Sequence, residues 1–271
     1  MRTRIAPTPS GYLHRGNAAN ALLTHWWATS EGGTVALRID DVDAPRMRPE
    51  YVHDVHDLLK WLQIPLHRSP DPRRAGVGTQ EGRVERARAV LDQARRNGLP
   101  AYACRCSRSI LDGVPRGGCP AGCRTAGHAL EPGGAVLRIA VPEGAFVRVD
   151  GRDIDLAAAM GDFVIWRRDD LPAYQWFSVV EDTDAQVTHI LRGEDLVESS
   201  AAQLHLAQYL DDTCFRDAVI RHHGLVVDER AMKLSKSQLG AAGPLPRTDE
   251  EREEVQRIAR SLGRAIGLPV A

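Results

Sequence analysis

Lysine is almost missing from this chain of 271 residues. Of its 35 Lys and Arg residues 32 are arginine, and the three lysines are Lys60, Lys233 and Lys236. Two of the three therefore fall within the five residues KLSKS, positions 233–237. A polar loop that bears lysine is usually just exposed to solvent. The concentration of the rare residue in one loop raises the question of what this loop needs an ammonium group for.

Excess charge, an apolar leader and long hydrophobic runs are also absent. The net charge is −1 at pH 7, so a nucleic-acid partner would have to meet a local patch of Lys or Arg. The first residues, MRTRIAPTPSGY, lack the apolar core of a signal peptide, and no run approaches the roughly 18 apolar residues of a membrane span. We therefore expect a cytoplasmic protein with no membrane partner, and we also expect a monomer.

Only one of the five cysteines lies outside a single cluster, which argues against a disulfide framework. Cys104, Cys106, Cys119 and Cys123 follow the spacing C-x-C-x12-C-x3-C. Four thiolates so close in the chain suit a tetrahedral structural Zn²⁺ ion. Free or redox-active thiols are the alternative. The sequence thus predicts a zinc site within residues 99–150, a segment rich in Gly, Pro and Cys that looks like an insert.

The first hundred residues alternate between strand and helix patterns. Residues 2–7 and 34–39 are typical of short strands, with a helix between them from about Asn17. Such a strand–helix–strand unit forms parallel strands with a right-handed crossover, so we expect an α/β fold with a parallel sheet. Ligands bind such sheets at the carboxyl ends of the strands. Helices are also expected over Glu50–Leu62 and Glu81–Asn97.

Regular patterning returns after the insert. The stretch GDFVIWRRDDLPAYQWFSVV, residues 161–180, predicts two strands about a polar turn. A strand over 185–193 and a helix over Ser199–Leu210 follow. The last predicted helix is amphipathic and begins with a capping box formed by Thr248 and Glu251.

His14 lies in a glycine-bounded turn, GYLHRGN, just before the first expected helix. A ring N–H and the backbone N–H groups of a helix N-terminus can together bind a phosphate. For this residue alone, a merely structural histidine is the simpler interpretation. Because this turn precedes the KLSKS loop along the same chain, the phosphate-binding interpretation of His14 becomes the favoured one.

RIAPTPSGYLHRGN near the start and KLSKS near residue 235 resemble the HIGH and KMSKS signatures of class I aminoacyl-tRNA synthetases, in the form found in the glutamyl-tRNA synthetase group. LRIDDVD, GDFVIWRRDDLPAYQ and THILRGEDLVESSAAQ are similar to three further blocks of that group. The five blocks run in order from Arg4 to Ser237. The resemblance implies a Rossmann-type class I catalytic core with a parallel sheet, a small zinc-binding insert and no anticodon-binding domain.

The same resemblance divides the chain into four ranges. Residues 1–98 would form the first half of the Rossmann catalytic domain and 99–150 the zinc-binding, connective insert. Residues 151–210 would complete the catalytic domain. Residues 211–271 would form a stem region that bears the KMSKS-like loop and a C-terminal helix.

The resemblance also implies which residues handle ATP, the substrate that arrives with Mg²⁺. The catalytic pair is His14, which stabilises the transferring phosphate, and Lys236, whose mobile ammonium can follow the departing pyrophosphate. The full ATP-binding set is His14, Gly16, Asn17, Lys233, Ser235 and Lys236.

A glutamate pocket is implied in the same way. Its residues are Arg4, Thr8, Asp40, Tyr174 and Arg192. The two arginines suit bidentate capture of carboxylates, the aspartate suits the α-ammonium, and the tyrosine can supply a hydroxyl. Taken singly, each would be an ordinary surface ion pair or a core tyrosine.

Four positions depart from the family's pattern. Arg15 stands where an apolar residue is usual, Asp40 replaces a glutamate, and Thr8 and Ser10 exchange the usual serine and threonine. The first departure puts the ATP affinity in question, and the second puts the fit of the amino acid in question.

Within this group the chain most resembles the glutamyl-queuosine tRNA(Asp) synthetases, because only 34 residues follow Ser237 and because those enzymes carry a similar zinc site, often with tyrosine at the place of Cys119. They activate L-glutamate with ATP and transfer it to queuosine in the anticodon loop of tRNA(Asp), so the chain is expected to be such a ligase. The alternatives are a truncated glutamyl-tRNA synthetase that charges a tRNA 3′ end and a non-catalytic paralogue that binds tRNA or an amino acid. Residues 83–96, rich in arginine, are either a local basic surface for RNA or a solvated helix face.

Overall fold

The computed structural model describes residues 1–40, 47–67, 80–107, 110, 119, 122–226 and 243–271. The chain folds into two compact units, each built from segments that are distant in sequence. The first unit comprises 1–70, 187–196 and 218–271, and the second comprises 71–186 and 197–217. The four ranges expected from the sequence are consecutive stretches of the chain, whereas these two units are defined by which segments pack together. Each unit is described by itself.

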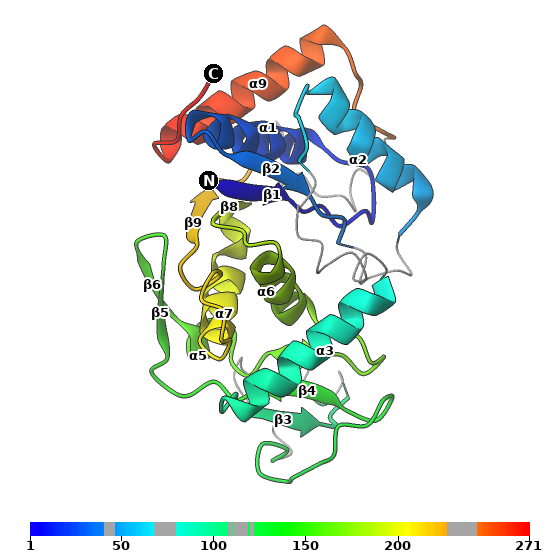
Figure 1. Ribbon diagram of the computed structural model, residues 1–271, viewed down its shortest axis with the longest axis vertical. Helices are drawn as coiled ribbons and strands as arrows, with labels where there is room; N and C mark the ends of the chain where they lie inside the picture. Colours follow the sequence, from blue (N-terminus) through cyan, green and yellow to red (C-terminus); the bar gives the residue numbers. More distant parts are fainter. Residues whose placement is uncertain (41–46, 68–79, 108–109, 111–118, 120–121, 227–242) are drawn as a thin grey trace. The chain divides into compact units, whose positions relative to one another are not determined.

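Parallel strands form the centre of the first unit (Figure 1). Strand β1 (Arg2–Ile5) pairs in parallel with β2 (Thr34–Leu37), and β8 (His189–Gly193) pairs in parallel with β9 (Val219–His223). The Thr188 amide donates a hydrogen bond to the Arg2 carbonyl at 2.9 Å, which joins the beginnings of β8 and β1. The predicted parallel strand–helix–strand unit is therefore confirmed.

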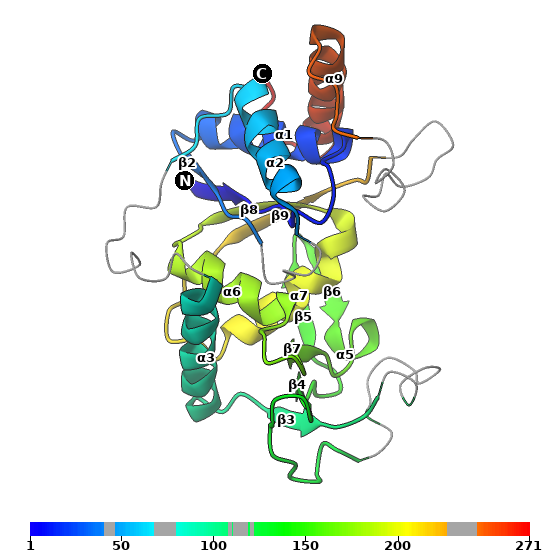
Figure 2. The ribbon, with the colours of Figure 1, turned by 90° about the vertical axis from the view of Figure 1, so that its right-hand side faces the viewer.

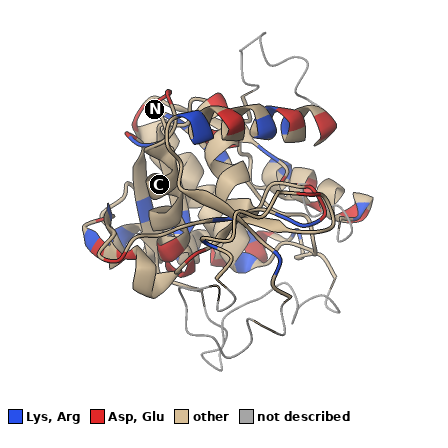
Figure 3. Ribbon diagram, turned by 90° about the horizontal axis from the view of Figure 1, so that it is seen from below, with Lys and Arg blue, Asp and Glu red and all other residues tan. Residues whose placement is uncertain are grey.

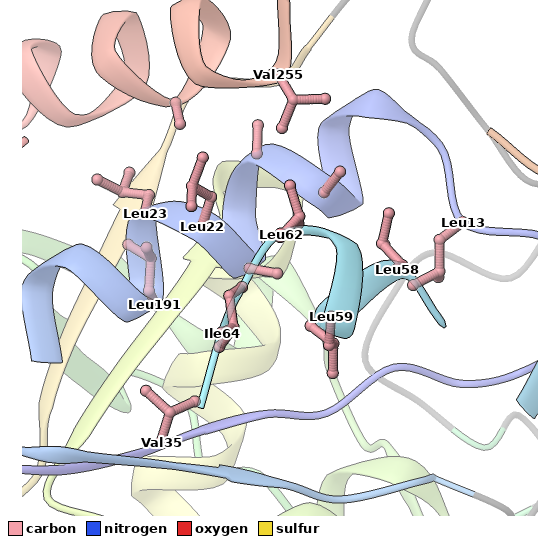
Figure 4. Packing of buried hydrophobic residues seen from close by; sticks show 14 of the residues in the cluster. Leu13, Leu22, Leu23, Val35, Leu58, Leu59, Leu62, Ile64, Leu191 and Val255 are labelled. Atoms are coloured by element: carbon pink, nitrogen blue, oxygen red, sulfur yellow. The ribbon is translucent and has the colours of Figure 1, made fainter. Parts of the chain in front are cut away.

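In the described part of this unit three helices lie against these strands, and the middle one is buried on two sides. They are α1 (Arg15–Ser30), α2 (Pro49–Trp61) and α9 (Asp249–Ala265), and a single 3-10 turn, Glu194–Leu196, follows β8. Because α1 packs on the strands and also on α9, its apolar residues are not confined to one stripe. Figure 4 shows the core that results, with Leu22 and Leu23 of α1 between Val255 of α9 and Leu191 of β8.

The helix α9 approaches α1 closely because its contact face carries small residues. Its buried positions are Glu251, Val255, Ala259 and Gly263. A Cβ on Gly263 would lie 2.8 Å from Cδ1 of Leu23 and still closer to Cγ1 of Val270, so a larger residue would force these side chains to move. The predicted start of this helix is confirmed, since the Thr248 hydroxyl accepts from the Glu251 amide at 3.2 Å.

The second unit is built on an antiparallel sheet whose strand order is β3-β4-β7. Its strands are β3 (Ala101–Cys104), β4 (Val136–Ile139) and β7 (Val164–Trp166), and a separate hairpin consists of β5 (Phe146–Val149) and β6 (Arg152–Asp155). Among the described residues of this unit, the helices with given bounds are α3 (Gln80–Arg96), α5 (Leu156–Ala159), α6 (Tyr174–Asp184) and α7 (Val197–Ala207). Figure 2 shows α6 and α7 beside each other, in agreement with their packing.

One predicted element is wrong. The second of the two strands expected within 161–180 is the helix α6, whereas the first is β7 as predicted. The segment is rich in aromatic and β-branched residues, which favour strands. Its buried Trp176, Val179, Val180 and Thr183 nevertheless recur at the three- and four-residue spacing of a helix.

Three of the five arginines of the helix α3 are paired with acidic residues. Arg83 lies 3.4 Å from Glu181, and Arg86 and Arg88 each lie 2.8 Å from an acid, Asp184 and Asp170 respectively. Figure 3 shows acidic and basic positions interspersed along the helices. Three of the arginines in 83–96 therefore balance acidic residues of their own unit. None of the described helices is both long and apolar enough to cross a lipid bilayer.

Candidate active site

Residues from several strands lie at the carboxyl ends of the first unit's two parallel strand pairs, β1-β2 and β8-β9. The chain leaves β1, β2, β8 and β9 at their carboxyl ends, and the parallel pairing places the ends of paired strands together. Open α/β sheets bind ligands at this edge. Arg4 lies on β1, Thr8 in the turn after it, Asp40 just after β2, and Arg192 on β8.

Two buried guanidinium groups mark this edge. The exposed fractions of Arg4 and Arg192 are 7% and 3%. Arginine is seldom so completely buried, because removing its charge from water is costly unless carboxylates or hydrogen bonds compensate. A guanidinium held in this way is a fixed, forked donor for a carboxylate. Both positions suit the capture of an acidic substrate.

Asp40 is also buried, and it has a neighbour that the sequence interpretation overlooked. The Arg38 Nε and Nη2 donate to the two Asp40 carboxylate oxygens at 2.6 and 3.3 Å. The Asp40 amide donates to the Pro7 carbonyl at 3.1 Å, which fixes this carboxylate beside the turn that contains Thr8. A substrate ammonium group that binds Asp40 would therefore share the negative charge of this carboxylate with Arg38.

His14 is the N-cap of α1, and its ring is oriented by the helix itself. The Gly16 amide donates to Nδ1 of His14 at 3.1 Å, and the His14 amide donates to the Asn17 side-chain oxygen at 3.2 Å. Because Nδ1 accepts, the neutral ring carries its proton on Nε2. The turn therefore combines a fixed imidazole N–H with the positive end of the α1 dipole, which is an arrangement that favours a phosphate.

Gly16 allows a second segment to reach this turn. A Cβ at this position would lie 3.1 Å from two ring atoms of His14 and 3.3 Å from Cβ of Val226. Val226 follows β9 and is the last described residue before 227–242. The absence of a side chain at Gly16 thus lets the chain after β9 pack on the N-terminus of α1.

The residues that follow 227–242 return to the same turn. Asp54 of α2 accepts from the Leu13 amide at 3.2 Å and from Nη2 of Arg247 at 2.5 Å. Val226, which directly precedes 227–242, and Arg247, which lies four residues after Gly243, therefore both connect to residues 13–16. Lys233, Ser235 and Lys236 themselves lie outside the described residues.

His223, at the end of β9, is a further polar residue of this edge that sequence reasoning missed. Its Nδ1–H donates to the Gly224 carbonyl at 2.7 Å, and the ring is 5% exposed. Burial lowers the pKa of His223, so the ring is kept neutral. The two consecutive histidines, His222 and His223, were the only sequence signal, and no strand was predicted there.

Tyr174 lies in the second unit, where it is the first residue of α6 and 43% exposed. Its neighbour Gln175 donates to the Ser199 hydroxyl at 3.1 Å and accepts from Gln203 at 3.2 Å. These bonds tie the beginning of α6 to α7 and fix the backbone that carries the tyrosine.

The four clustered cysteines come together in the second unit as the spacing predicts. Their sulfur atoms all lie within 4.8 Å of one another, with Cys106 to Cys119 at 3.1 Å and Cys104 to Cys119 at 3.7 Å. A tetrahedral Zn²⁺ with bonds of about 2.3 Å separates its sulfur ligands by about 3.8 Å, so the cluster fits such an ion. In the thiol form, hydrogen bonding to Cys119 and burial raise the pKa of Cys106 to about 12.

A buried carboxylate holds this cysteine cluster against the sheet. Asp162 accepts from the Tyr102 hydroxyl at 2.7 Å, from the Val141 amide at 2.9 Å and from Arg124 at 2.5 Å. Burial, and then the hydrogen bond to Asp162, raise the pKa of Tyr102. Because Tyr102 lies two residues before the first cysteine of the cluster and Arg124 directly follows the last, Asp162 joins both ends of the cluster.

The sequence matches the family model for class I tRNA synthetases (E and Q), catalytic domain, over residues 1–116 and 124–264. It is 38% identical over 262 residues to a protein of Pseudomonas aeruginosa named glutamyl-Q tRNA(Asp) synthetase, covering 96% of this chain and 84% of that protein. It is 36% identical over 247 residues to the glutamate–tRNA ligase of Thermobifida fusca, covering 87% of this chain and 50% of that protein.

Among solved structures, the glutamate–tRNA synthetase of Elizabethkingia anophelis matches with a TM-score of 0.71 and 22% identity, covering 90% of this chain and 54% of that one. The chain thus spans about half the length of that synthetase and of the Thermobifida ligase. The fold is that of a class I synthetase catalytic core. The chain belongs to the glutamyl and glutaminyl family of class I tRNA synthetases.

Proposed function

We propose that the protein is a ligase that activates L-glutamate with ATP and transfers the glutamyl group to queuosine in the anticodon loop of tRNA(Asp). The observation that carries this proposal is the alignment with glutamyl-Q tRNA(Asp) synthetases over nearly the whole chain and over 84% of their own length. The first unit supports it, because the His14 turn at the N-terminus of α1 and the buried Arg4 and Arg192 have the chemistry that a phosphate and an acidic substrate require.

The first step is attack by a glutamate carboxylate oxygen on the α-phosphorus of ATP, which breaks the bond to pyrophosphate and gives glutamyl-adenylate. Negative charge grows on phosphate oxygens, so the protein's work is positioning and electrostatic stabilisation. His14 would donate its Nε2–H to the transferring phosphate. Lys236 and Lys233, with Ser235, would neutralise the departing pyrophosphate, and Mg²⁺ arrives with ATP.

Glutamate would be held by groups of opposite charge. Arg4 and Arg192 would bind its carboxylates, and Asp40 its α-ammonium. Because Arg38 already pairs with Asp40, the Asp40 carboxylate would be shared between the Arg38 guanidinium and the substrate ammonium. A glutamate at position 40, which is usual in the family, would be one methylene longer and would place its carboxylate differently. Thr8 and Tyr174 would supply hydroxyl groups. In the second step a hydroxyl of the queuosine cyclopentenediol attacks the glutamyl carbonyl, and AMP leaves.

Zn²⁺ would be bound by Cys104, Cys106, Cys119 and Cys123 and would have a structural role. The ion would join the end of β3 to a glycine-rich stretch that contains few apolar residues of its own. No chemical step requires it.

Two measurements test the proposed function. The first is glutamate-dependent exchange of pyrophosphate into ATP in the absence of tRNA, with other amino acids as controls. The second is transfer of radiolabelled glutamate to tRNA(Asp) with and without queuosine, and to tRNA(Glu). Labelling confined to queuosine-containing tRNA(Asp) supports the proposal. Labelling of tRNA(Glu), or labelling independent of queuosine, would favour 3′-end charging, and absence of exchange would favour a non-catalytic paralogue.

The chain offers a matched control for the lysine assignment. We expect Lys236→Ala to lower the exchange rate by at least about 10², the scale of losing one preorganised charge. Lys60→Ala removes the only lysine outside the KLSKS stretch. This lysine lies on the exposed face of α2, so its loss should leave the rate unchanged. Equal rates for the two variants would overturn the role of Lys236.

A further inference from the structure

The departure from the family's pattern at position 15 has a partner at the far end of the chain. The Arg15 Nε and Nη2 donate to the two carboxylate oxygens of Glu251, at 2.5 and 2.7 Å. This is the paired geometry in which an arginine and a carboxylate interact most strongly. Arg15 is the first residue of α1 and directly follows His14, whereas Glu251 lies in the first turn of α9.

The Glu251 side chain is held for this contact. It is 7% exposed, and its backbone amide already donates to the Thr248 hydroxyl. In a full capping box the glutamate would turn back to the backbone of the N-cap residue. Here both oxygens accept from Arg15 instead, so the first turn of α9 is joined to the first turn of α1.

A second ion pair links the same two regions. Arg247 binds Asp54, and Asp54 accepts from the amide of Leu13, the residue before His14. Arg247 and Arg252 also lie over the ring of Trp61, at 5.6 and 5.3 Å from its centre. These contacts fix the approach to α9 on the end of α2.

We propose that Arg15, Asp54, Arg247 and Glu251 form a brace that positions the His14 turn for ATP, so that the beginning of α9 acts on the nucleotide site without touching the nucleotide. Glu251 acts through Arg15, and Arg247 acts through Asp54. The inference rests on the proposed function, because it takes the His14 turn to be the ATP site. It assigns to Arg15 the role of a positioning residue rather than of a phosphate ligand.

The two roles of Arg15 predict different patterns across a set of variants. If Arg15 belongs to the brace, Glu251→Gln weakens ATP binding, and Arg15→Leu weakens it further because Glu251 is left buried without its cation. The double variant Arg15→Leu/Glu251→Leu then binds ATP better than Arg15→Leu alone. If Arg15 instead binds a phosphate, Glu251→Gln has no effect, and the single and double leucine variants are equally weak.

The experiment measures the dissociation constant of ATP by calorimetry and the KM values for ATP and glutamate in pyrophosphate exchange. We expect Glu251→Gln to raise the ATP dissociation constant about fivefold, a plausible size for one charge-assisted pair whose arginine is half exposed. The KM for glutamate should stay within about twofold, because Glu251 does not contact the residues of the glutamate set. A change in both KM values to the same extent would indicate general loosening and overturn the proposal.

A matched control lies on the same helix. Arg257 and Glu254 form a paired contact at 2.6 Å within α9, and the charge of Glu254 acts on Arg15 more weakly than on Arg257. Glu254→Gln should therefore change the ATP dissociation constant much less than Glu251→Gln does, and thermal unfolding of every variant identifies any loss of fold. An effect of Glu254→Gln equal to that of Glu251→Gln would overturn the brace.

Failure of the brace and failure of the proposed function give different results. Wild-type protein without glutamate-dependent exchange would refute the proposed function whatever the variants do. Wild-type exchange with an ATP affinity that is insensitive to Glu251→Gln would refute the brace and leave the proposed function standing. Protection of the amides of residues 13–17 from hydrogen exchange, lower in Glu251→Gln than in wild type, is the expected structural signature.

Discussion

Replacing Gly16 by alanine should lower the activity of the protein without lowering its stability. The new Cβ would lie 3.1 Å from Cε1 and Nδ1 of His14 and 3.3 Å from Cβ of Val226, where ordinary contacts begin at 3.4 Å. The imidazole would therefore have to move by a few tenths of an ångström, or the chain after β9 would have to withdraw. Since a displacement of about 1 Å at a reacting centre can cost about 10² in rate, we expect about a tenfold loss.

The same substitution should leave the fold intact. Alanine is favoured over glycine in helices by up to about 1 kcal/mol, which offsets the local crowding at this second helical position. The midpoint of thermal unfolding should then change by no more than a few degrees. A loss of activity that accompanies a large loss of stability would mean that the effect is not specific to His14.

The assay is glutamate-dependent pyrophosphate exchange, with Gly134→Ala as the control. A Cβ on Gly134 would meet Glu131 atoms only at 3.5 Å and beyond, which is ordinary contact, and this residue lies in the second unit. Exchange by Gly16→Ala at the rate of Gly134→Ala would refute the argument that the oriented His14 ring takes part in ATP chemistry.

Three further predictions concern the second unit. Protein purified without chelators should contain about one zinc ion per chain, and Cys119→Ser should release it faster to a chromogenic chelator; metal content far below one ion in the wild type would refute the site. Asp162→Asn should lower the free energy of unfolding by about 2 kcal/mol, since it weakens a buried acceptor of Tyr102 and Arg124, and urea denaturation measures this. Burial lowers the pKa of His205 below its ordinary 6.5, so the unfolded chain takes up this proton first and stability should fall as the pH drops below about 6.5. The variant His205→Phe should show a flatter dependence, and an unchanged dependence would contradict this origin.

Local patterns in the sequence were enough for most elements and for the cysteine cluster. The strands around α1 follow from short apolar runs, and the four cysteines lie close in the chain, so little besides local structure is needed to bring them together. The helix α6 could not be distinguished from a strand, because its buried aromatic and β-branched residues favour strands and its packing on α7, β7 and α3 selects the helix.

Contacts between distant residues could not be predicted in the same way. Glu251 looked like part of a capping box, and nothing near it in the sequence indicates Arg15, which is 236 positions away. Asp54 and Arg247 are likewise ordinary charged residues of amphipathic segments. Their pairing depends on how α1, α2 and α9 pack, and that arrangement is set by three-dimensional fit rather than by local spacing.

The contact between the two ends of the chain has a consequence for synthesis on the ribosome. Domains tend to fold as their residues emerge, starting from the N-terminus. The turn at His14 appears among the first residues made, yet Glu251 becomes available only after 250 residues have been joined. With the proposed brace, an incomplete nascent chain would bind ATP several-fold more weakly, and adenylate formation would become faster once α9 has docked.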